Sequence, residues 1–264
     1  MSRKNYALVT GASSGIGAAL AAVYARAGYD VILIARREDR LLALQAELIK
    51  TFNICAQIVP CDLSDAATPN QIAKTCANND WKIDVLINNA GYGVPGEFCA
   101  SEWSIHKQGL QVMLLAPCEL VHLFQPAMAQ RGYGRILNIA SVAGIAPGGK
   151  GHTLYGATKA ALIKFSQSLN IECRNTGVHA TAVCPGLTYS EFHDVNGMRD
   201  KLSNLPQFMW QSAEQVAERA YTASEKNKAV AVTGIVNKCL AAFAKLTPDS
   251  IAIEVMRARS KALD

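Results

Sequence analysis

The sequence lacks closely spaced cysteine pairs and a strong excess of one charge. Its eight cysteines include no C-x-x-C pair and lie mostly within apolar runs such as ICAQIVPC, which argues against a disulfide framework or a cysteine-rich metal site. We expect buried free thiols in a reducing compartment and no bound metal. An excess of one charge is also lacking, because 26 basic and 21 acidic residues leave a net charge of +5 that is scattered along the chain. This excludes a nucleic-acid partner but suits a small anionic ligand.

Long apolar runs are missing as well. The N-terminal MSRKNYALVTG holds an apolar run too short for the core of a signal peptide, and we expect no later segment to reach membrane-spanning length. We therefore expect a cytoplasmic protein with no membrane span. The chain also lacks internal repeats and linkers, and its 264 residues, half of them hydrophobic, suffice for one domain over residues 1–264.

Seven short runs rich in apolar and β-branched residues are present, and helix-length segments separate most of them. The strands are expected at residues 6–10, 30–35, 54–60, 83–88, 135–141, 178–184 and 229–234. This alternation predicts an α/β fold, a Rossmann-like doubly wound sheet of about seven parallel strands with helices on both faces. Such sheets bind ligands at the carboxyl ends of their strands.

Proline and glycine mark the helix boundaries. Thr68 followed by Pro69 predicts the start of a helix. Gly132 predicts the end of the long helix that contains QVMLLAP, and Gly177 predicts the end of the next helix.

The last third of the chain has two further features. Residues 186–211 form a long irregular stretch with an apolar FMW cluster, which is typical of a substrate lid. Residues 235–264 are expected to form a C-terminal helical tail. Its first part has apolar residues at helical spacing, namely Ile235, Val236, Cys239, Leu240, Phe243 and Leu246. With only Lys238 and Lys245 on the polar side, this pattern favours packing on the domain or on a partner subunit over a membrane surface.

The first strand is followed by TGASSGIG and then by a helical segment. Gly11, Gly15 and Gly17 let the backbone turn tightly and approach a pyrophosphate, and the helix that follows supplies free N–H groups. A glycine-rich turn without function is the alternative. It is disfavoured because strand, glycines and helix occur in the order that a dinucleotide site requires.

The spacing G-x-x-x-G-x-G resembles the TGxxxGxG motif of the short-chain dehydrogenase/reductase superfamily. Four more motifs follow in that family's order: CDLS at 61–64, NNAG at 88–91, YGATK at 155–159 and PG at 185–186. One such motif arises easily by chance, but five in register extend over essentially the whole chain. The resemblance implies a nicotinamide-dependent oxidoreductase.

The residues after the second strand distinguish the two nicotinamide cofactors. An acidic side chain there would bind the ribose hydroxyls of NAD, whereas this chain has Arg36 and Arg37. Arginine suits a phosphate through its charge and its forked donors. Two solvated arginines are the alternative, although helix starts prefer acidic residues. We therefore predict NADP(H), with Ser13 and Ser14 as additional contacts.

The resemblance implies positions for the rest of the cofactor. Asp62 and Leu63 would contact the adenine, although Asp62 has an alternative role as the cap of a turn. Thr188 or Ser190 would reach the carboxamide of the nicotinamide. The cofactor-binding residues implied are Gly11, Ser13, Ser14, Gly15, Ile16, Gly17, Arg36, Arg37, Asp62, Leu63, Asn89, Ala90, Gly91, Tyr155, Lys159, Pro185, Gly186 and Thr188.

Tyr155 and Lys159 lie four residues apart, so in a helix their side chains emerge on one face. An ammonium within reach is expected to lower the pKa of the phenol from about 10 towards neutrality. An ordinary amphipathic helix is the alternative. The resemblance implies that Tyr155 is the general acid or base, that Lys159 holds the nicotinamide ribose, and that Ser141 hydrogen-bonds the substrate oxygen.

These residues predict an NADP(H)-dependent oxidoreductase that reduces an apolar ketone or aldehyde, or oxidises a secondary alcohol. Two alternatives are a 3-oxoacyl thioester reductase and a cofactor-binding sensor that has lost catalysis. The resemblance also implies a homodimer or homotetramer, formed through the long helices that flank the fifth strand.

Met113 stands where many members of the superfamily carry an asparagine that completes the site. A thioether cannot replace the amide, because sulfur is a poor acceptor and no donor. Pro117, four residues on, has no N–H to give to the carbonyl of Met113. We therefore predict that this carbonyl is free to hold a water on the side of Lys159.

Overall fold

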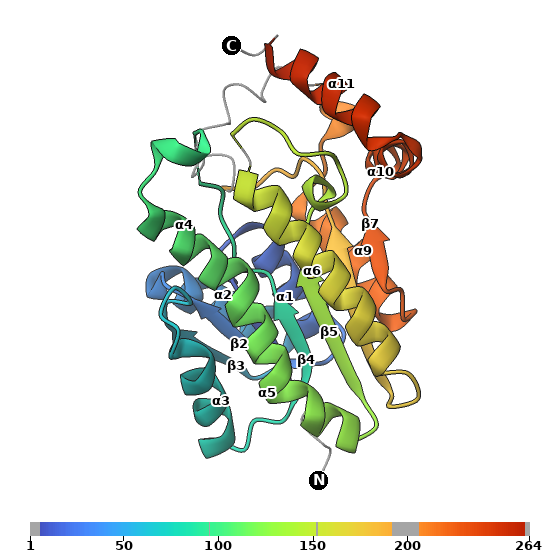
Figure 1. The fold of residues 1–264 in the computed structure, drawn as a ribbon. Coiled ribbons are helices and arrows are strands. Elements are labelled where there is room, and N and C mark those ends of the chain that lie inside the picture. Colours follow the sequence, from blue (N-terminus) through green and yellow to red (C-terminus); the bar gives the residue numbers. More distant parts are fainter. Residues whose placement is uncertain (1–5, 95, 152, 192–205, 262–264) are drawn as a thin grey trace.

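The computed structural model describes residues 6–94, 96–151, 153–191 and 206–261 (Figure 1). Seven strands form one parallel sheet in the order β3-β2-β1-β4-β5-β6-β7. Their bounds are β1 Tyr6–Thr10, β2 Asp30–Ala35, β3 Ala56–Pro60, β4 Ile83–Asn88, β5 Gly134–Ile139, β6 Val178–Cys184 and β7 Val230–Val232. The doubly wound α/β fold is thus confirmed. Strand order reverses between β1 and β4, which places a ligand crevice at their carboxyl ends.

Helices cover both faces of the sheet. One face packs against α1 (Gly15–Arg26), α2 (Glu38–Phe52) and α9 (Ala213–Glu225). The other packs against α3 (Thr68–Asn78), α5 (Ala116–Gln130) and α6 (Thr153–Glu172). Short 3-10 turns lie at η1 (Phe98–Ala100), η3 (Val142–Gly144) and η4 (Gln207–Met209), and α10 (Ile235–Leu246) and α11 (Asp249–Lys261) follow β7. Both last helices lie near the carboxyl end of the sheet in Figure 1.

The helix boundaries follow the proline and glycine signals closely. α3 begins at Thr68 with Pro69 in its first turn. Gly132 has a φ of +69° just after α5, whereas Gly177 lies five residues beyond the end of α6 because turns intervene. A Cβ on Gly177 would lie 2.0 Å from the carbonyl oxygen of Gly132, so only glycine lets these two chain turns touch.

α4 (Trp103–Leu110), a π-helical stretch η2 (Gln111–Leu115) and α5 form one continuous helix. By length and composition alone it could cross a membrane, which corrects the expectation that no segment reaches that length. Its inner side packs on the sheet through Val112, Leu120 and Phe124. The arrangement is that of a core helix in an α/β domain.

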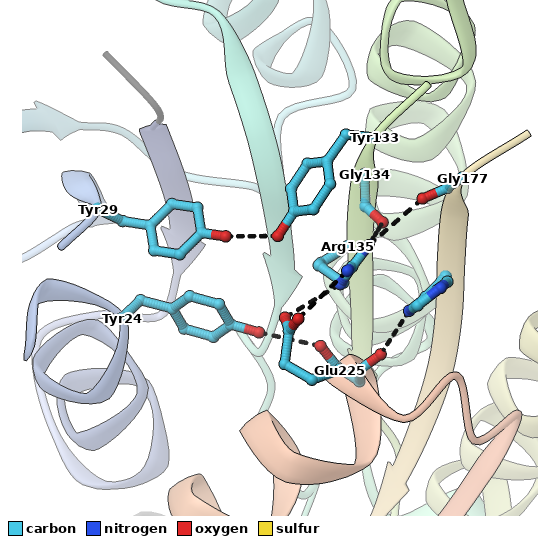
Figure 2. Close-up of polar contacts among 9 residues, drawn as sticks. Tyr24, Tyr29, Tyr133, Gly134, Arg135, Gly177 and Glu225 are labelled. Atoms are coloured by element: carbon cyan, nitrogen blue, oxygen red, sulfur yellow. Dashed lines mark hydrogen bonds and ion pairs between the residues drawn. The ribbon is translucent and has the colours of Figure 1, made fainter. Parts of the chain in front are cut away.

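A polar cluster joins α1 and α9 to the amino ends of the central strands (Figure 2). The Arg135 side chain donates to both carboxylate oxygens of Glu225, at 3.0 and 3.2 Å, and to two glycine carbonyls. Tyr29 and Tyr133 share a hydrogen bond of 2.5 Å, and Tyr24 bonds the serine that precedes Glu225. The cluster lies at the edge opposite the ligand crevice, so we assign it to stability.

All eight cysteines are free thiols, but their burial differs from the expectation. Cys76, Cys173 and Cys184 are buried, and two others are half-buried. The exposed thiols are Cys55, Cys99 and Cys239. For these three the prediction of burial is wrong, because they lie in the loop before β3, in η1 and on the outer side of α10.

Candidate active site

A cleft of about 960 Å³ opens at the carboxyl ends of the strands. All the predicted site residues except Gly17 line it, including those of the glycine loop and the motifs that follow β2, β4, β5 and β6. The sequence motifs, which lie up to 177 residues apart in the chain, therefore meet around one space.

Gly17 lies under the glycine loop. A Cβ at this position would be 2.2 Å from the Gly11 carbonyl oxygen and 2.5 Å from the Asn89 amide nitrogen. That amide donates to the Thr10 and Gly11 carbonyls, at 3.0 and 3.1 Å. The loop is thus held against the end of β4, and α1 begins at Gly15, which lines the cleft together with Ile16. The first amides of a helix have no partner within the helix. This backbone cradle fits a pyrophosphate.

Arg37, more than Arg36, organises the expected phosphate end of the cleft. Its guanidinium donates to the Ser13 hydroxyl at 3.0 Å and to the Ser14 hydroxyl at 3.1 Å. The Arg36 side chain is 71% exposed and lies 4.0 Å from Asp62. The two serines and Arg37 together form a cluster of donors suited to a phosphate.

Glu191 and Arg40 join this cluster and were missed from the sequence. The Glu191 carboxylate accepts from Arg37 at 2.8 Å and from Arg40, and these hydrogen bonds, that from Arg40 first, lower the pKa of Glu191 to about 2. Arg40 follows Arg37 by one helical turn, a spacing that could have revealed it. Glu191 carries no such signal, because the chain fold alone brings it across the cleft.

The ends of β3 and β4 are pinned by local hydrogen bonds. Asp62 lines the cleft and also accepts from the Ser64 amide at 2.9 Å, so its alternative role as a turn cap is real as well. The Thr10 hydroxyl accepts from the Asn89 and Ala90 amides, at 2.9 and 3.2 Å. These contacts fix the NNAG segment beside the glycine loop.

Ser141, Tyr155 and Lys159 lie together where β5 ends. The Tyr155 side chain is hydrogen-bonded to the Ser141 side chain. The Lys159 ammonium lies 5.7 Å from the centre of the Tyr155 ring and donates to the Ile139 carbonyl at 2.7 Å. Lys159 is buried, with 4% of its surface exposed.

The electrostatics of this group correct one expectation. Burial raises the pKa of Tyr155 to about 12, and the hydrogen bond from Ser141, not the charge of Lys159, opposes the rise. Burial also lowers the pKa of Lys159 to about 8. Lys159 does not lower the phenol pKa here because its hydrogen bond goes to the backbone of β5 and desolvation dominates both groups.

Met113 forms part of the wall behind these residues. It lies in the π-helical stretch, where the Ala116 amide donates to the Gln111 carbonyl. A Cβ on Gly91 would be 3.4 Å from the Met113 sulfur and 3.6 Å from the Lys159 nitrogen, so both side chains cover the same glycine. Single π-helical turns occur often at functional sites. This turn lies just before Pro117, whose missing N–H predicts an interruption of the ordinary helical hydrogen bonds at this point.

The turn after β6 is supported from the C-terminal helices. The Thr188 hydroxyl donates to the Gly186 carbonyl at 3.0 Å, and Ser190 lies against Gly15. A Cβ on Gly186 would be 2.2 Å from the side-chain oxygen of Asn237. The Asn237 amide in turn donates to the Thr233 carbonyl at 2.8 Å.

The C-terminal helices also contribute residues that line the cleft and that no sequence motif predicted. Asn237 and Leu240 of α10 and Met256 of α11 line the cleft. Of the expected lid, 186–211, the structure describes residues 186–191 and 206–211, and the remainder lies outside the described residues. Within those ranges Leu187 and Met209 face the cleft.

A small cavity of about 20 Å³ adjoins Tyr155 on the side of α4. Met113 and Leu110 contribute apolar walls. His106, 7% exposed, also lines it; its Nε2 bonds the Phe98 carbonyl at 2.8 Å, and its Nδ1 meets no partner among the described residues. This histidine was not singled out from the sequence, because it belongs to no motif.

A doubly wound parallel sheet with a glycine loop at the switch point is the architecture of Rossmann-like dinucleotide-binding proteins. The family model for short chain dehydrogenase matches residues 5–199, and the chain belongs to this family. It is accordingly an oxidoreductase of the short-chain type, a family that uses a nicotinamide cofactor.

Individual relatives agree with this assignment. The ketoacyl reductase HetN of Nostoc sp. is 31% identical over 252 residues, which cover 92% of this chain and 85% of the relative. A short-chain dehydrogenase from Sphingobium yanoikuyae in complex with NADPH is 30% identical, with a TM-score of 0.79 and coverage of 99% of this chain and 95% of the other. The bulky-bulky ketone specific alcohol dehydrogenase from Comamonas testosteroni is 28% identical, with a TM-score of 0.75 and coverage of 100% and 94%.

Proposed function

We propose that the protein is an NADP(H)-dependent oxidoreductase that reduces a ketone or aldehyde carbonyl, with the oxidation of a secondary alcohol as the reverse reaction. One observation carries the proposal: Ser141, Tyr155 and Lys159 lie beside one another in the cleft that the glycine loop borders. A phenol next to a hydroxyl and an ammonium is equipped to bind and protonate an oxygen.

Each of the three side chains has one task in this mechanism. Ser141 donates a hydrogen bond to the substrate oxygen and so holds it beside Tyr155. When bound, the nicotinamide supplies the hydride. Tyr155 gives its proton to the oxygen, and Lys159 would bind the ribose next to the nicotinamide. In oxidation, Tyr155 takes the proton instead.

The protonation state of Tyr155 favours reduction as the working direction. With a pKa of about 12, the buried phenol carries its proton at neutral pH in the protein without cofactor. That form is ready to act as an acid, whereas oxidation would first require its deprotonation.

The preference for NADP(H) rests on the cluster around Arg37. Its guanidinium and the Ser13 and Ser14 hydroxyls converge at the adenosine end of the cleft, where the 2′-phosphate distinguishes the two cofactors. The relative from Sphingobium yanoikuyae was solved in complex with NADPH, which supports the proposal. The expected result is a higher kcat/KM with NADPH than with NADH, and a reversal of that order in Arg37→Asp.

Reduction of a 3-oxoacyl thioester is the second candidate. It is favoured by the relative named as a ketoacyl reductase and by the apolar walls that Leu187, Met209, Leu240 and Met256 give the cleft. Oxidation of NADPH against a panel of apolar ketones, aldehydes and 3-oxoacyl thioesters separates the two enzyme functions. Binding of NADPH without its consumption by any substrate in the panel would support a sensor instead.

We also propose that the protein works in the cytoplasm as a homodimer or homotetramer. Free exposed thiols at Cys55, Cys99 and Cys239 suit a reducing compartment. Exposed Leu115, the last residue of η2, offers an apolar contact beside the helices expected to associate. Light scattering on the purified protein measures the number of subunits.

A further inference from the structure

Helix α10, the first of the two helices after β7, turns its apolar side away from the domain. Five residues recur at helical spacing and share its outer face, and we call them the α10 stripe: Ile235, Cys239, Ala242, Phe243 and Leu246. The exposed fractions of Ile235, Phe243 and Leu246 are 78%, 64% and 83%. These values contradict the first of the two expected arrangements, in which the apolar pattern packs on its own domain, and leave packing on a partner subunit untested.

The side of α10 that does face the domain is small and polar. Asn237 and Ala241 are its buried residues. Asn237 donates a hydrogen bond to the Thr233 carbonyl and fits against Gly186. The orientation of α10 is therefore fixed by specific contacts, and the stripe is left outside as a consequence.

Other apolar side chains are exposed on η4, which contacts α10, and on α11, which follows it in the chain. Phe208 of η4, which packs near α10, is 73% exposed. On α11, Ile251, Ile253 and Val255 are 55%, 50% and 52% exposed. The same elements send Leu240, Met209 and Met256 to the cleft. An apolar surface of several neighbouring side chains usually marks an interaction site.

The charges beside the stripe indicate what covers it. Lys238 and Lys245 are exposed and lie two helical turns apart on one edge of the stripe. α10 contains no acidic residue, so a second copy packed through α10 alone would offer these lysines no carboxylate from that helix. A surface of anionic lipid headgroups provides that missing complement.

We propose that the α10 stripe docks on an anionic lipid bilayer. Phe243, Leu246 and Ile235 would enter the boundary between headgroups and acyl chains, and Lys238 and Lys245 would contact the headgroups. The cleft mouth then faces the membrane, where apolar molecules are concentrated. The proposal concerns a surface and does not depend on which carbonyl compound the protein reduces.

Vesicle flotation of the full chain tests the proposal. Vesicles of phosphatidylcholine mixed with phosphatidylglycerol should bind the protein, vesicles of phosphatidylcholine alone should bind it less, and added salt should weaken binding to the first kind. The F243S/L246S variant should bind roughly tenfold or more weakly, because two apolar side chains no longer leave water. Each lysine removed in K238Q/K245Q should reduce binding on the order of fivefold.

Ile171→Ser provides the matched control. Ile171 is 72% exposed on α6 and belongs to no part of the stripe, so its loss should leave vesicle binding unchanged. NADPH affinity should be the same in all variants, which verifies that they are folded, because none of the substituted side chains lines the cleft.

A labelled thiol gives a second readout that needs no loss of apolar residues. Cys239 lies in the stripe and is exposed, so an environment-sensitive fluorophore attached there should shift to the blue with anionic vesicles. The same label on exposed Cys55 should not shift. Absence of binding to anionic vesicles, or equal binding by F243S/L246S, would overturn the proposal. So would light scattering that shows the wild type to be a larger oligomer than F243S/L246S, because a second copy would then cover the stripe.

Discussion

At the scale of single residues, Tyr155 is the side chain on which the proposed chemistry depends. Tyr155→Phe removes the proton donor and keeps the ring. We expect carbonyl reduction to fall on the order of 10²–10⁴-fold, with NADPH affinity nearly unchanged. Steady-state kinetics and a fluorescence titration measure the two quantities. Tyr189→Phe is the control, because the Tyr189 ring is half exposed, stacks on Trp210 and is not among the residues that line the cleft. If Tyr155→Phe keeps its turnover, Tyr155 is not the proton donor.

Glu191 is a second residue whose effect can be measured. Its carboxylate occupies donors of Arg37 and Arg40 that we expect a phosphate to need. Glu191→Gln should therefore strengthen NADP⁺ binding by up to about fivefold, the usual limit for an exposed ion pair, and leave NAD⁺ binding unchanged. Isothermal titration with both cofactors provides the comparison.

The matched control for Glu191 is Glu218→Gln. Glu218 forms a similar exposed pair with Arg26, away from the cleft, so its removal should alter neither affinity. If Glu191→Gln instead weakens NADP⁺ binding, the carboxylate orders the arginines and does not compete with the phosphate.

At the scale of the structural elements, the π-helical stretch next to Pro117 invites a direct test. Pro117→Ala supplies an N–H that can restore ordinary helical pairing of the Met113 carbonyl. If that carbonyl holds the water beside Lys159, kcat should fall several-fold and its pH profile should shift, while NADPH affinity stays the same. A crystal structure that has no water between the Met113 carbonyl and Lys159 would contradict the hypothesis.

Pro126→Ala is the control for the same helix. Pro126 lies within α5, more than two turns beyond the π-helical stretch, and does not line the cleft. Its replacement tests whether any proline removed from α5 changes catalysis. Only Pro117→Ala should shift the pH profile.

The elements also reveal which parts of the fold can be predicted from the sequence. The positions of the strands could be predicted, because a buried parallel strand forms a nearly continuous apolar run, as residues 31–35 of β2 do. The orientation of α10 could not, since an apolar stripe predicts an amphipathic helix but does not say which side faces the domain. Asn237 against Gly186 decides that orientation, and no local pattern reveals a contact between residues so far apart in the chain.

The candidate site divides in the same way. Ser141, Tyr155 and Lys159 were predicted because their spacing and order form motifs. Glu191, which approaches Arg37 only in the folded chain, was not. The electrostatic role of Lys159 was also mispredicted, because charge alone was considered and burial has the larger effect on both its own pKa and that of Tyr155.

At the scale of the whole molecule, the buried Lys159 affects stability. Burial lowers its pKa from 10.5 to about 8, so between these pH values the unfolded chain binds a proton that the folded chain does not. The free energy of unfolding therefore rises with pH across this window. Between pH 8 and pH 10 the free energy of unfolding of the wild type should rise by on the order of 2 kcal/mol more than that of Lys159→Met.

Denaturant titrations of the protein without cofactor measure this difference. Comparison of two variants cancels the contributions of other groups, among them Tyr155, whose raised pKa lowers stability above pH 10. Lys164→Met, on the exposed side of α6, shows the general effect of removing a lysine from this helix. If the free energy of unfolding changes with pH in the same way in the wild type and in Lys159→Met, the lowered pKa of Lys159 is refuted.

The contact between Asn237 and Gly186 has a consequence for how such a chain can diversify. The family model ends at residue 199, yet the turn after β6 is supported by an asparagine beyond that limit. The segment that the family model matches and the C-terminal helices are therefore joined through one close contact, in which the Asn237 side chain occupies the space that a side chain at Gly186 would need. A chimaera that takes its C-terminal helices from a relative should fold and bind cofactor only when the residues at positions 186 and 237 fit each other. Exchange of the residues on the outer face of α10 should change neither folding nor cofactor binding.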